Sequence, residues 1–174
     1  MAEQTPDNTA PLGAPQGNGA ADPNAPQFAP QAVYIKDVSF ESPSGPRVQP
    51  NTQTNPTINL NMSTAVNELG PELREVVLTV HLQAMVGDKS LWLVELQQAG
   101  AFAMRNFPQD QLPRLLGIFC PDYLLPYARQ TVSDLLMKGG FPPFLLPPVN
   151  FDALYNQAVQ QQALQQQTAP TPIN

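Results

Sequence analysis

Histidine and cysteine are almost absent from this chain of 174 residues, which has one of each. A catalytic triad or a Cys/His pair would have to be built around His81, and one Cys with one His cannot complete a zinc site. Cys120 stands between Phe119 and Pro121, where a buried thiol that packs in a core is expected. We therefore expect no enzyme, no metal site and no cofactor, and we interpret His81 as a surface or interface residue.

Charged residues are also scarce, at 13% of the chain, and basic residues are the scarcer kind. Lys and Arg together number 8 against 14 Asp and Glu, so the formal net charge is −6. Nucleic acids are bound by Lys and Arg that displace counterions, so this balance argues against a nucleic-acid partner and favours a basic one. The glycines are scattered, and Gly139-Gly140 lacks the Lys and Ser/Thr that follow in a phosphate-binding loop.

A membrane-spanning run and a secretory signal are missing too. Pro121 and Pro126 break the longest apolar candidate before it reaches the roughly 20 residues of a membrane helix. The first residues show no basic-then-apolar pattern, and Cys120 has no second cysteine with which to form a disulfide. These features predict a cytoplasmic protein with no direct membrane insertion.

Proline, by contrast, is abundant, and it marks the ends of the folded region. Residues 1–31 mix proline with Gly, Asn, Gln and Ala, and Phe28 is their only aromatic residue. Such a segment buries too little apolar area to offset its ordering entropy, so we predict a disordered tail there. The composition of residues 168–174 predicts a second disordered tail. The length between them fits one domain, over residues 32–167.

Within this domain, residues 34–41, 58–62, 75–84 and 92–97 alternate between apolar and polar, which predicts strands with one face on a core. In the first segment this period places Tyr34 on one face with Val38 and Phe40. It places Ile35 on the wetter face with Asp37, Ser39 and Glu41. The short turn at residues 87–89 predicts an antiparallel hairpin between the last two strands.

After Gly100 the apolar spacing lengthens toward 3.6, which predicts helices over about 108–119 and 122–138, kinked or divided by Pro121 and Pro126. Gly139-Gly140 predicts a helix stop, followed by an apolar, proline-rich loop up to Pro148. Asn150 can cap a last amphipathic helix. Strands followed by helices indicate an α+β domain, with helices on one face of the sheet.

Two features exceed what a packed domain requires, and pattern alone leaves each with two interpretations. The outer sheet face carries Asp37 and Glu41 with Leu93 and Glu95, and strand parity places no Lys or Arg beside them. It is either an ordinary solvated face or a docking surface. The proline-rich loop and last helix either pack on their own core or form an adaptable hydrophobic groove.

Four segments in order, 34–41, 93–100, 120–129 and 148–154, resemble the SecB export-chaperone family. They read Tyr34-Ile35-Lys36-Asp37-Val38-Ser39-Phe40-Glu41, Leu93-Val94-Glu95-Leu96-Gln97-Gln98-Ala99-Gly100, Cys120-Pro121 with Pro126-Tyr127-Ala128-Arg129, and Pro148-Val149-Asn150-Phe151-Asp152-Ala153-Leu154. The resemblance covers residues 33–166. It implies a four-stranded antiparallel sheet with a long helix and a C-terminal helix on one face, assembled as a dimer of dimers.

The resemblance also implies a function. The family binds unfolded precursor polypeptides without ATP, keeps them competent for translocation and passes them to the SecA ATPase. By similarity, Asp37, Glu41, Leu93 and Glu95 would dock the basic, zinc-containing C-terminal tail of SecA, so that the zinc belongs to the partner. The client groove would use a set from the loop and the last helix: Phe141, Phe144, Leu145, Leu146, Phe151, Leu154 and Tyr155.

The chain departs from the family pattern in the connection from Ser42 to Thr57, which has no aromatic residue where relatives often carry them. Its C-terminal tail is Gln-rich and not strongly acidic. Two other interpretations stay open. One is a SecB-like chaperone dedicated to a toxin-antitoxin pair, and the other is an enzyme, against which the sparse His and Cys content argues.

Overall fold

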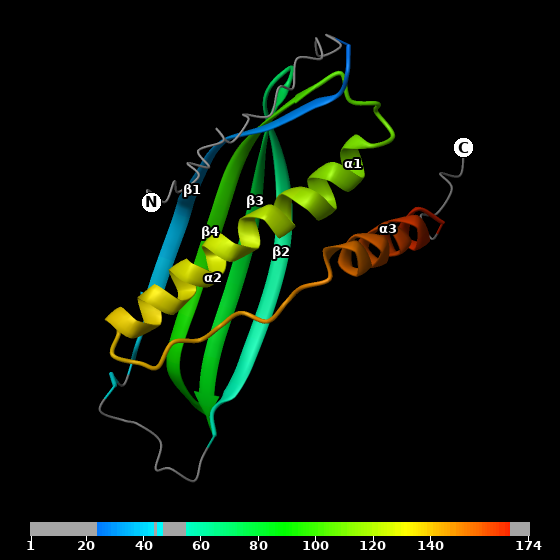
Figure 1. Ribbon diagram of the computed structural model, residues 1–174. Helices are drawn as coiled ribbons and strands as arrows, with labels where there is room; N and C mark the ends of the chain where they lie inside the picture. Colours follow the sequence, from blue (N-terminus) through cyan, green and yellow to red (C-terminus); the bar gives the residue numbers. More distant parts are fainter. Residues whose placement is uncertain (1–23, 44, 47–54, 168–174) are drawn as a thin grey trace, which may run out of the picture.

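The protein forms two layers, a sheet and a set of helices, in a computed structural model that describes residues 24–43, 45–46 and 55–167 (Figure 1). The sheet is antiparallel, with strand order β1-β4-β3-β2. Its strands are β1 (Gln27–Glu41), β2 (Thr57–Gly70), β3 (Leu73–Val86) and β4 (Lys89–Arg105). The predicted four-stranded antiparallel sheet and the hairpin at residues 87–89 are confirmed.

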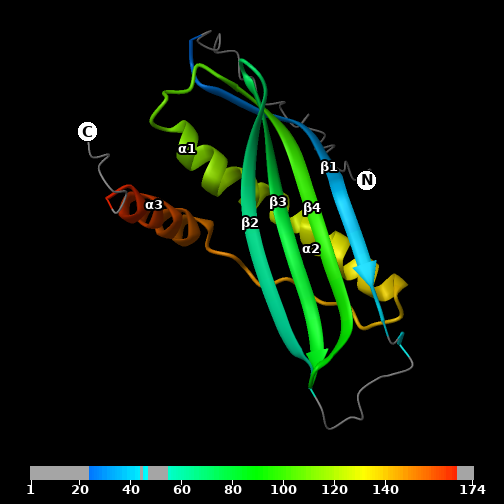
Figure 2. The same cartoon turned by 180° about the vertical axis from the view of Figure 1, so that it is seen from behind.

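The helices lie on one side of this sheet. They are α1 (Leu112–Arg114), the π-helical turn η1 (Leu115–Phe119), α2 (Cys120–Lys138) and α3 (Phe151–Gln167). The first three cross the sheet diagonally, and α3 follows a loop that leads past β2 (Figure 1). Seen from behind, no labelled helix lies in front of the sheet (Figure 2). We call the two sides the helix face and the outer face.

The core lies between the helix face and α2. Alternate residues of the two central strands, among them Leu78 and Leu82 of β3 and Leu96 of β4, are fully buried. From α2 they meet residues at helical spacing, which are Leu124, Ala128, Val132 and Leu136, all with no exposed surface. The buried residues recur every two positions in the strands and about every 3.6 positions in the helix. The apolar spacing of the sequence therefore predicted this interface correctly.

Strand β1 begins at Gln27, inside the segment predicted to be a disordered tail, so the predicted boundary at residue 31 is wrong. Phe28 explains the difference, because its ring lies 5.5 Å from that of Phe102 and 5.2 Å from that of Phe119. One aromatic side chain on a sheet edge buries area that the composition of the tail did not indicate. Residues 1–23 and 168–174, and with them the remaining tail predictions, lie outside the described residues.

For the β1 residues directly before Lys36, the predicted sheet faces are wrong. Ile35 pairs with Gln98 and Asp37 with Gln97, so Lys36 is an extra residue, a β-bulge. The bulge reverses the alternation, and it places Tyr34 on the outer face with Asp37 while Ile35 turns to the helix face. Val38, opposite Leu96, lies on the helix face as predicted.

The helical segments also differ from prediction, because residues 112–138 are helical without the expected gap at 120–121. Pro121 has no N–H to donate, and directly before it the chain widens into a π turn in which Cys120 N–H donates to the Leu115 carbonyl. The predicted stop after Lys138 is confirmed, with Gly140 at φ 81°. The predicted cap is confirmed too, since Asn150 Oδ1 accepts a hydrogen bond of 2.9 Å from Ala153 N–H.

Candidate binding surfaces

The four predicted docking residues lie together on the outer face of β1 and β4. Glu41 is paired with Leu93, and Ser39, two residues before it, is paired with Glu95. Asp37, Glu41 and Glu95 are exposed and Leu93 is half-buried. We call these residues, Asp37, Glu41, Leu93 and Glu95, the acidic surface. It is a strip of carboxylates around one apolar side chain, on a face that no described helix covers (Figure 2).

His81 borders the acidic surface from β3. It is paired with Glu95, and its Nε2 lies 3.6 Å from Glu95 Oε1, with 44% of its side chain exposed. The prediction of a surface histidine is confirmed.

A cluster around Glu75 lies next to the acidic surface and corrects the prediction that no Lys or Arg shares this face. Lys36 Nζ lies 2.6 Å from Glu75 Oε2, and Asn67 Nδ2 donates to the same oxygen at 2.7 Å. Tyr34 Oη donates to Glu75 Oε1. The Glu75 side chain is only 5% exposed. The parity argument missed Lys36 because it assumed a regular strand.

These hydrogen bonds stabilise the ionised carboxylate. Donation from Lys36, then from Tyr34 and Asn67, lowers the pKa of Glu75 to about 2, which outweighs the opposite effect of burial. The same bond, with burial and the negative charge of Glu75, raises the pKa of Tyr34 to about 12. Glu75 is therefore ionised at neutral pH, and its charge is offset locally by the Lys36 ammonium.

The cluster joins residues of β1, β3 and β2, since Asn67 belongs to β2, and its side chains cross β4 at small residues. Tyr34 and Lys36 belong to β1 and Glu75 to β3, with β4 between them. Opposite Tyr34 stands Ala99, and opposite Glu75 stands Ala101. Small side chains at these positions leave room for the long β1 residues to reach the carboxylate.

A second surface is a groove of about 630 Å³ between β2 and α3. Its lining is mostly apolar and includes Met62, Val66, Leu116, Leu154, Tyr155 and Val159. The sequence predicted Phe151, Leu154 and Tyr155 of this lining, but not the side contributed by β2, because the predicted strand ended at residue 62. The alternation that continues through Thr64 and Val66 was the available signal.

The predicted client residues fall into two groups. Leu145 and Leu154 are 72% and 44% exposed, and Phe141, Phe144 and Tyr155 are half-buried. Leu146 and Phe151 are 2% and 4% exposed, so neither offers a client the exposed side chain that its place in the predicted client set implied, although Phe151 lines the groove. Both are members of the core cluster, which fixes the loop and the start of α3 to the rest of the fold.

Helix α3 is attached mainly through η1 and the residue before it. Arg114 forms an ion pair with Asp152, and its guanidinium carbon lies 5.9 Å from the centre of the Tyr155 ring. At Gly117 an added Cβ would lie 2.5 Å from Tyr155 Cδ2, so only glycine admits the ring there. These contacts hold one wall of the groove in place.

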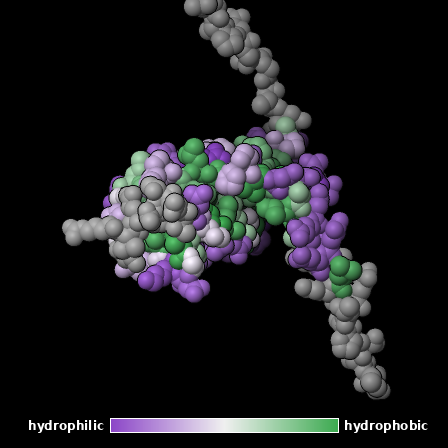
Figure 3. Space-filling model, turned by 90° about the horizontal axis from the view of Figure 1, so that it is seen from below, coloured by the Kyte–Doolittle hydropathy of each residue, from purple (hydrophilic) through white to green (hydrophobic). Residues whose placement is uncertain are grey.

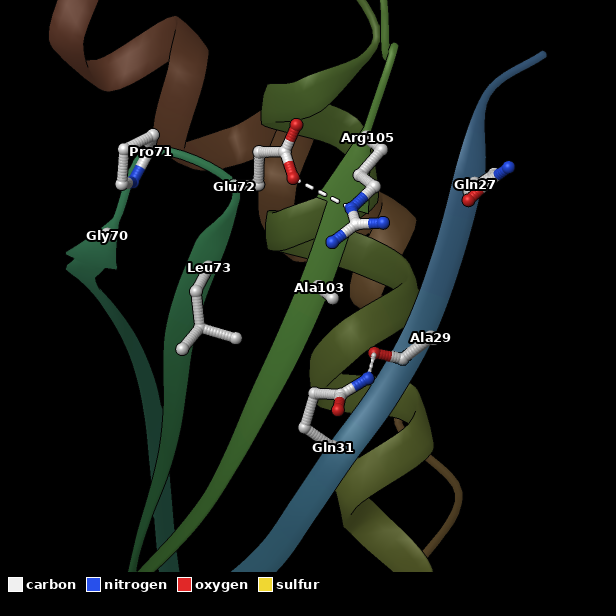
Figure 4. A pocket seen from close by; sticks show the side chains of 9 residues that line it. All are labelled: Gln27, Ala29, Gln31, Gly70, Pro71, Glu72, Leu73, Ala103 and Arg105. Carbon is white, nitrogen blue, oxygen red and sulfur yellow. Dashed lines mark hydrogen bonds and ion pairs between the residues drawn. The ribbon is translucent and has the colours of Figure 1, made fainter. Parts of the chain in front are cut away.

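A further depression, of about 780 Å³, lies on the outer face at the end of the sheet away from the acidic surface (Figure 4). It is lined by Gln27, Gln31, Pro71 and Leu73, and by Glu72, which pairs with Arg105 at 2.7 Å. None of the predicted site residues lines it.

Metal-binding side chains do not gather on the surfaces that the structure describes. Over the described residues, no three His, Cys, Asp or Glu side chains lie close enough together to hold a metal ion. Cys120 is fully buried, as predicted, and burial raises the pKa of its thiol to about 12. Among the helices of the described region, none is both long enough and apolar enough to span a membrane.

Comparison with known proteins identifies the family. The family model described as "Preprotein translocase subunit SecB" matches residues 21–162. This chain belongs to the SecB family. The protein-export protein SecB of Methylococcus capsulatus is 48% identical over 146 residues, which cover 84% of this chain and 93% of that one. That of Thiobacillus denitrificans is 46% identical over 147 residues, with 84% and 95% covered.

A solved structure supports the SecB fold. The Mycobacterium tuberculosis SecB-like chaperone, in complex with a ChAD peptide from an antitoxin, has a TM-score of 0.61 and is 17% identical. The match covers 70% of this chain and 90% of that one. At this identity the likeness concerns the fold alone, and it agrees with the sheet and helices described above.

Proposed function

We propose that this SecB-family chain is an ATP-independent chaperone that keeps precursor proteins unfolded in the cytoplasm and delivers them to SecA for export. The observation that carries the proposal is the separation of two surfaces with different chemistry. An apolar groove lies between β2 and α3, and a strip of carboxylates lies on the uncovered face of the sheet. One surface suits an unfolded chain and the other a basic partner.

Client binding would use the groove and the exposed residues beside it. An unfolded chain offers apolar side chains that a native domain has already buried, so an apolar groove selects unfolded clients. Leu154 and Tyr155 line the groove, and Leu145 is exposed on the loop that leads to it. A client that wraps over several such grooves binds tightly by avidity while each contact stays weak, so no ATP is needed for release at a single site.

Docking to SecA would use the acidic surface. A basic, zinc-containing tail complements Asp37, Glu41 and Glu95, and Leu93 adds an apolar contact in their midst. Charge complementarity of this kind mainly raises the association rate and fixes orientation. The zinc would come with the partner.

Assembly as a homotetramer, a dimer of dimers, would cover apolar side chains that a monomer exposes. Ile35 and Val38 on the helix face of β1 are 48% and 40% exposed, and Phe119 and Tyr127 are 49% and 43% exposed. Hydrophobic side chains also reach the surface in the end-on view (Figure 3). Such area on one side of a small domain favours a symmetric interface.

The proposal is tested by two measurements on one variant, Asp37→Lys with Glu95→Lys. We expect the variant to suppress aggregation of an unfolded precursor as well as the wild type, because the groove is unchanged. In calorimetry it should lose binding to SecA. A wild-type protein that does not suppress aggregation would refute the chaperone function, and unchanged SecA binding would refute the docking assignment.

The toxin-antitoxin alternative has less support. The relatives at 46% and 48% identity are protein-export proteins, whereas the SecB-like chaperone with the antitoxin peptide is 17% identical. Retention of all four acidic-surface residues also favours coupling to SecA. A pull-down with purified SecA separates the two, because a chaperone dedicated to an antitoxin has no need of that contact.

A further inference from the structure

The bulge in β1 brings a cation next to the acidic surface. In a regular strand Tyr34 and Asp37, three residues apart, would lie on opposite faces, but the extra residue Lys36 puts both on the outer face. Lys36 is adjacent to Asp37 in the chain. A free ammonium there would compete with a basic partner for the carboxylates.

Glu75 holds this cation. Its Oε2 lies 2.6 Å from Lys36 Nζ, and Asn67 Nδ2 donates to the same oxygen. Tyr34 Oη bonds the other oxygen, and on the helix face Gln98 Nε2 donates to the Tyr34 carbonyl at 2.9 Å. The bulge is therefore held from both faces. Lys36 extends across β4 to a carboxylate on β3, away from Glu41 and the end of β1.

We propose that Glu75 is a positioning residue for the docking surface, because it draws the Lys36 ammonium across β4 and neutralises it, so that this ammonium does not compete with a basic partner for the carboxylates of the acidic surface. The inference rests on the proposed docking of SecA at the acidic surface. It adds a residue outside that surface which sets the charge seen by the partner.

The charge of Lys36 acts only over a short distance on the outer face. Screening at physiological ionic strength limits interactions between exposed charges to about 8 Å, and a Lys36 ammonium released from Glu75 can come within that length of Asp37, the next residue in the chain. Glu72 and Arg105 form an ion pair of similar length on the same face, and it is more exposed than that of Lys36 and Glu75. Arg105 stands eight residues along β4 from Gln97, the partner of Asp37, which is roughly 26 Å away at the rise of a strand. That pair is too distant to influence docking.

The matched test compares Glu75→Gln with Glu72→Gln in the full chain. Both remove one negative charge and release one cation from an ion pair on the outer face. Calorimetry with a zinc-loaded synthetic peptide of the SecA C-terminal tail, at low and physiological salt, measures docking. We expect Glu75→Gln to weaken binding roughly fivefold to tenfold and Glu72→Gln to leave it unchanged. Equal affinity for the wild type and Glu75→Gln would overturn the inference.

A second variant distinguishes charge from damage to the fold. Glu75→Gln combined with Lys36→Met has no cation to release, so we expect its affinity for the peptide to return to within about twofold of the wild type. A double variant that stays as weak as Glu75→Gln would overturn the inference, because the weakening would then come from a disturbed strand.

The outcomes also separate this inference from the proposed function. If the Asp37→Lys, Glu95→Lys variant binds the peptide as tightly as the wild type, the docking site itself is wrong. If that variant loses binding while Glu75→Gln does not, the docking site stands and only the role of Glu75 fails.

Discussion

Arg129 Nε donates a hydrogen bond of 2.9 Å to the backbone carbonyl of Leu146, and this bond ties the loop between α2 and α3 to the long helix. Beside it the Leu146 side chain enters the core, while Leu145 is 72% exposed. Adjacent residues of one loop thus have opposite roles. Leu146 anchors the segment, and we propose that Leu145 contacts the client.

The pair Leu146→Ala and Leu145→Ala tests this division. Truncating Leu146 leaves a cavity in the core and should lower the free energy of unfolding by about 2 to 5 kcal/mol. Truncating Leu145 should leave stability within about 0.5 kcal/mol of the wild type, because the side chain is exposed. Denaturant unfolding checks both values.

Client affinity, measured on the same two proteins, completes the test. Leu145→Ala should bind an unfolded precursor more weakly, because the truncation removes an apolar side chain from the proposed client surface of every subunit in the proposed tetramer. Leu146→Ala should bind normally per folded molecule. If Leu146→Ala is as stable as the wild type but binds the client more weakly, Leu146 belongs to the client groove and not to the core.

The orientation of Leu146 could not be predicted from sequence, because a proline-rich loop has no period from which a face can be read. The strands were different. Alternation in β3 and β4 identified their buried faces correctly, since each pairs with two neighbours and has one face on α2. It failed in β1, where the direction of Tyr34 and Lys36 depends on a carboxylate 39 residues beyond Lys36 in the chain.

The two candidate binding surfaces show the same limit of prediction from local sequence pattern. Asp37, Glu41, Leu93 and Glu95 were grouped correctly because all of them lie beyond the bulge, in regular pairing. The groove was found only in part, since its β2 wall meets α3 through the fold and not through any local motif. The π turn at residues 115–119 was missed as well, and Pro121 was the only local sign of it.

Gly117→Ala should loosen α3. The new Cβ would lie 2.5 Å from Tyr155 Cδ2, so the ring must move and the cation–π contact with Arg114 weakens. We expect faster hydrogen exchange in α3 and altered client affinity, with the core unchanged. Gly70→Ala is the matched control, because its added Cβ would meet only Leu73 Cβ at 3.9 Å. If hydrogen exchange in α3 is equally fast in both variants, the contact between Gly117 and Tyr155 does not hold α3 in place.

Association should depend on the exposed apolar side chains of the helix face. We expect Tyr127→Lys, which places a charge where 43% of an aromatic side chain is exposed, to lower the mass of the assembly below that of a tetramer. Light scattering at micromolar concentration measures it. Lys138→Glu, at the C-terminal end of the same helix, is the control for a charge change on α2. A wild-type monomer would refute the tetramer.

Glu75 should make stability depend on pH. Its folded pKa of about 2 is below the ordinary value of 4.5, so its ionised form stabilises the fold at neutral pH. This contribution is complete above about pH 5 and is lost as the pH falls toward 2, because the unfolded carboxyl takes up its proton first. The full shift corresponds to roughly 3 kcal/mol, which is an upper limit because Lys36 is 40% exposed and screened by solvent.

The difference in unfolding free energy between the wild type and Glu75→Gln reports this contribution. We expect the wild type to be the more stable protein at pH 7, and the difference to shrink steadily in urea titrations at pH 5, 4 and 3. Glu68→Gln serves as the control, since Glu68 pairs with Arg74 at 3.1 Å but is 79% exposed. It should differ little from the wild type at any pH. A Glu75→Gln difference that is constant from pH 7 to pH 3 would mean that packing, and not the charge of Glu75, stabilises the cluster around Glu75.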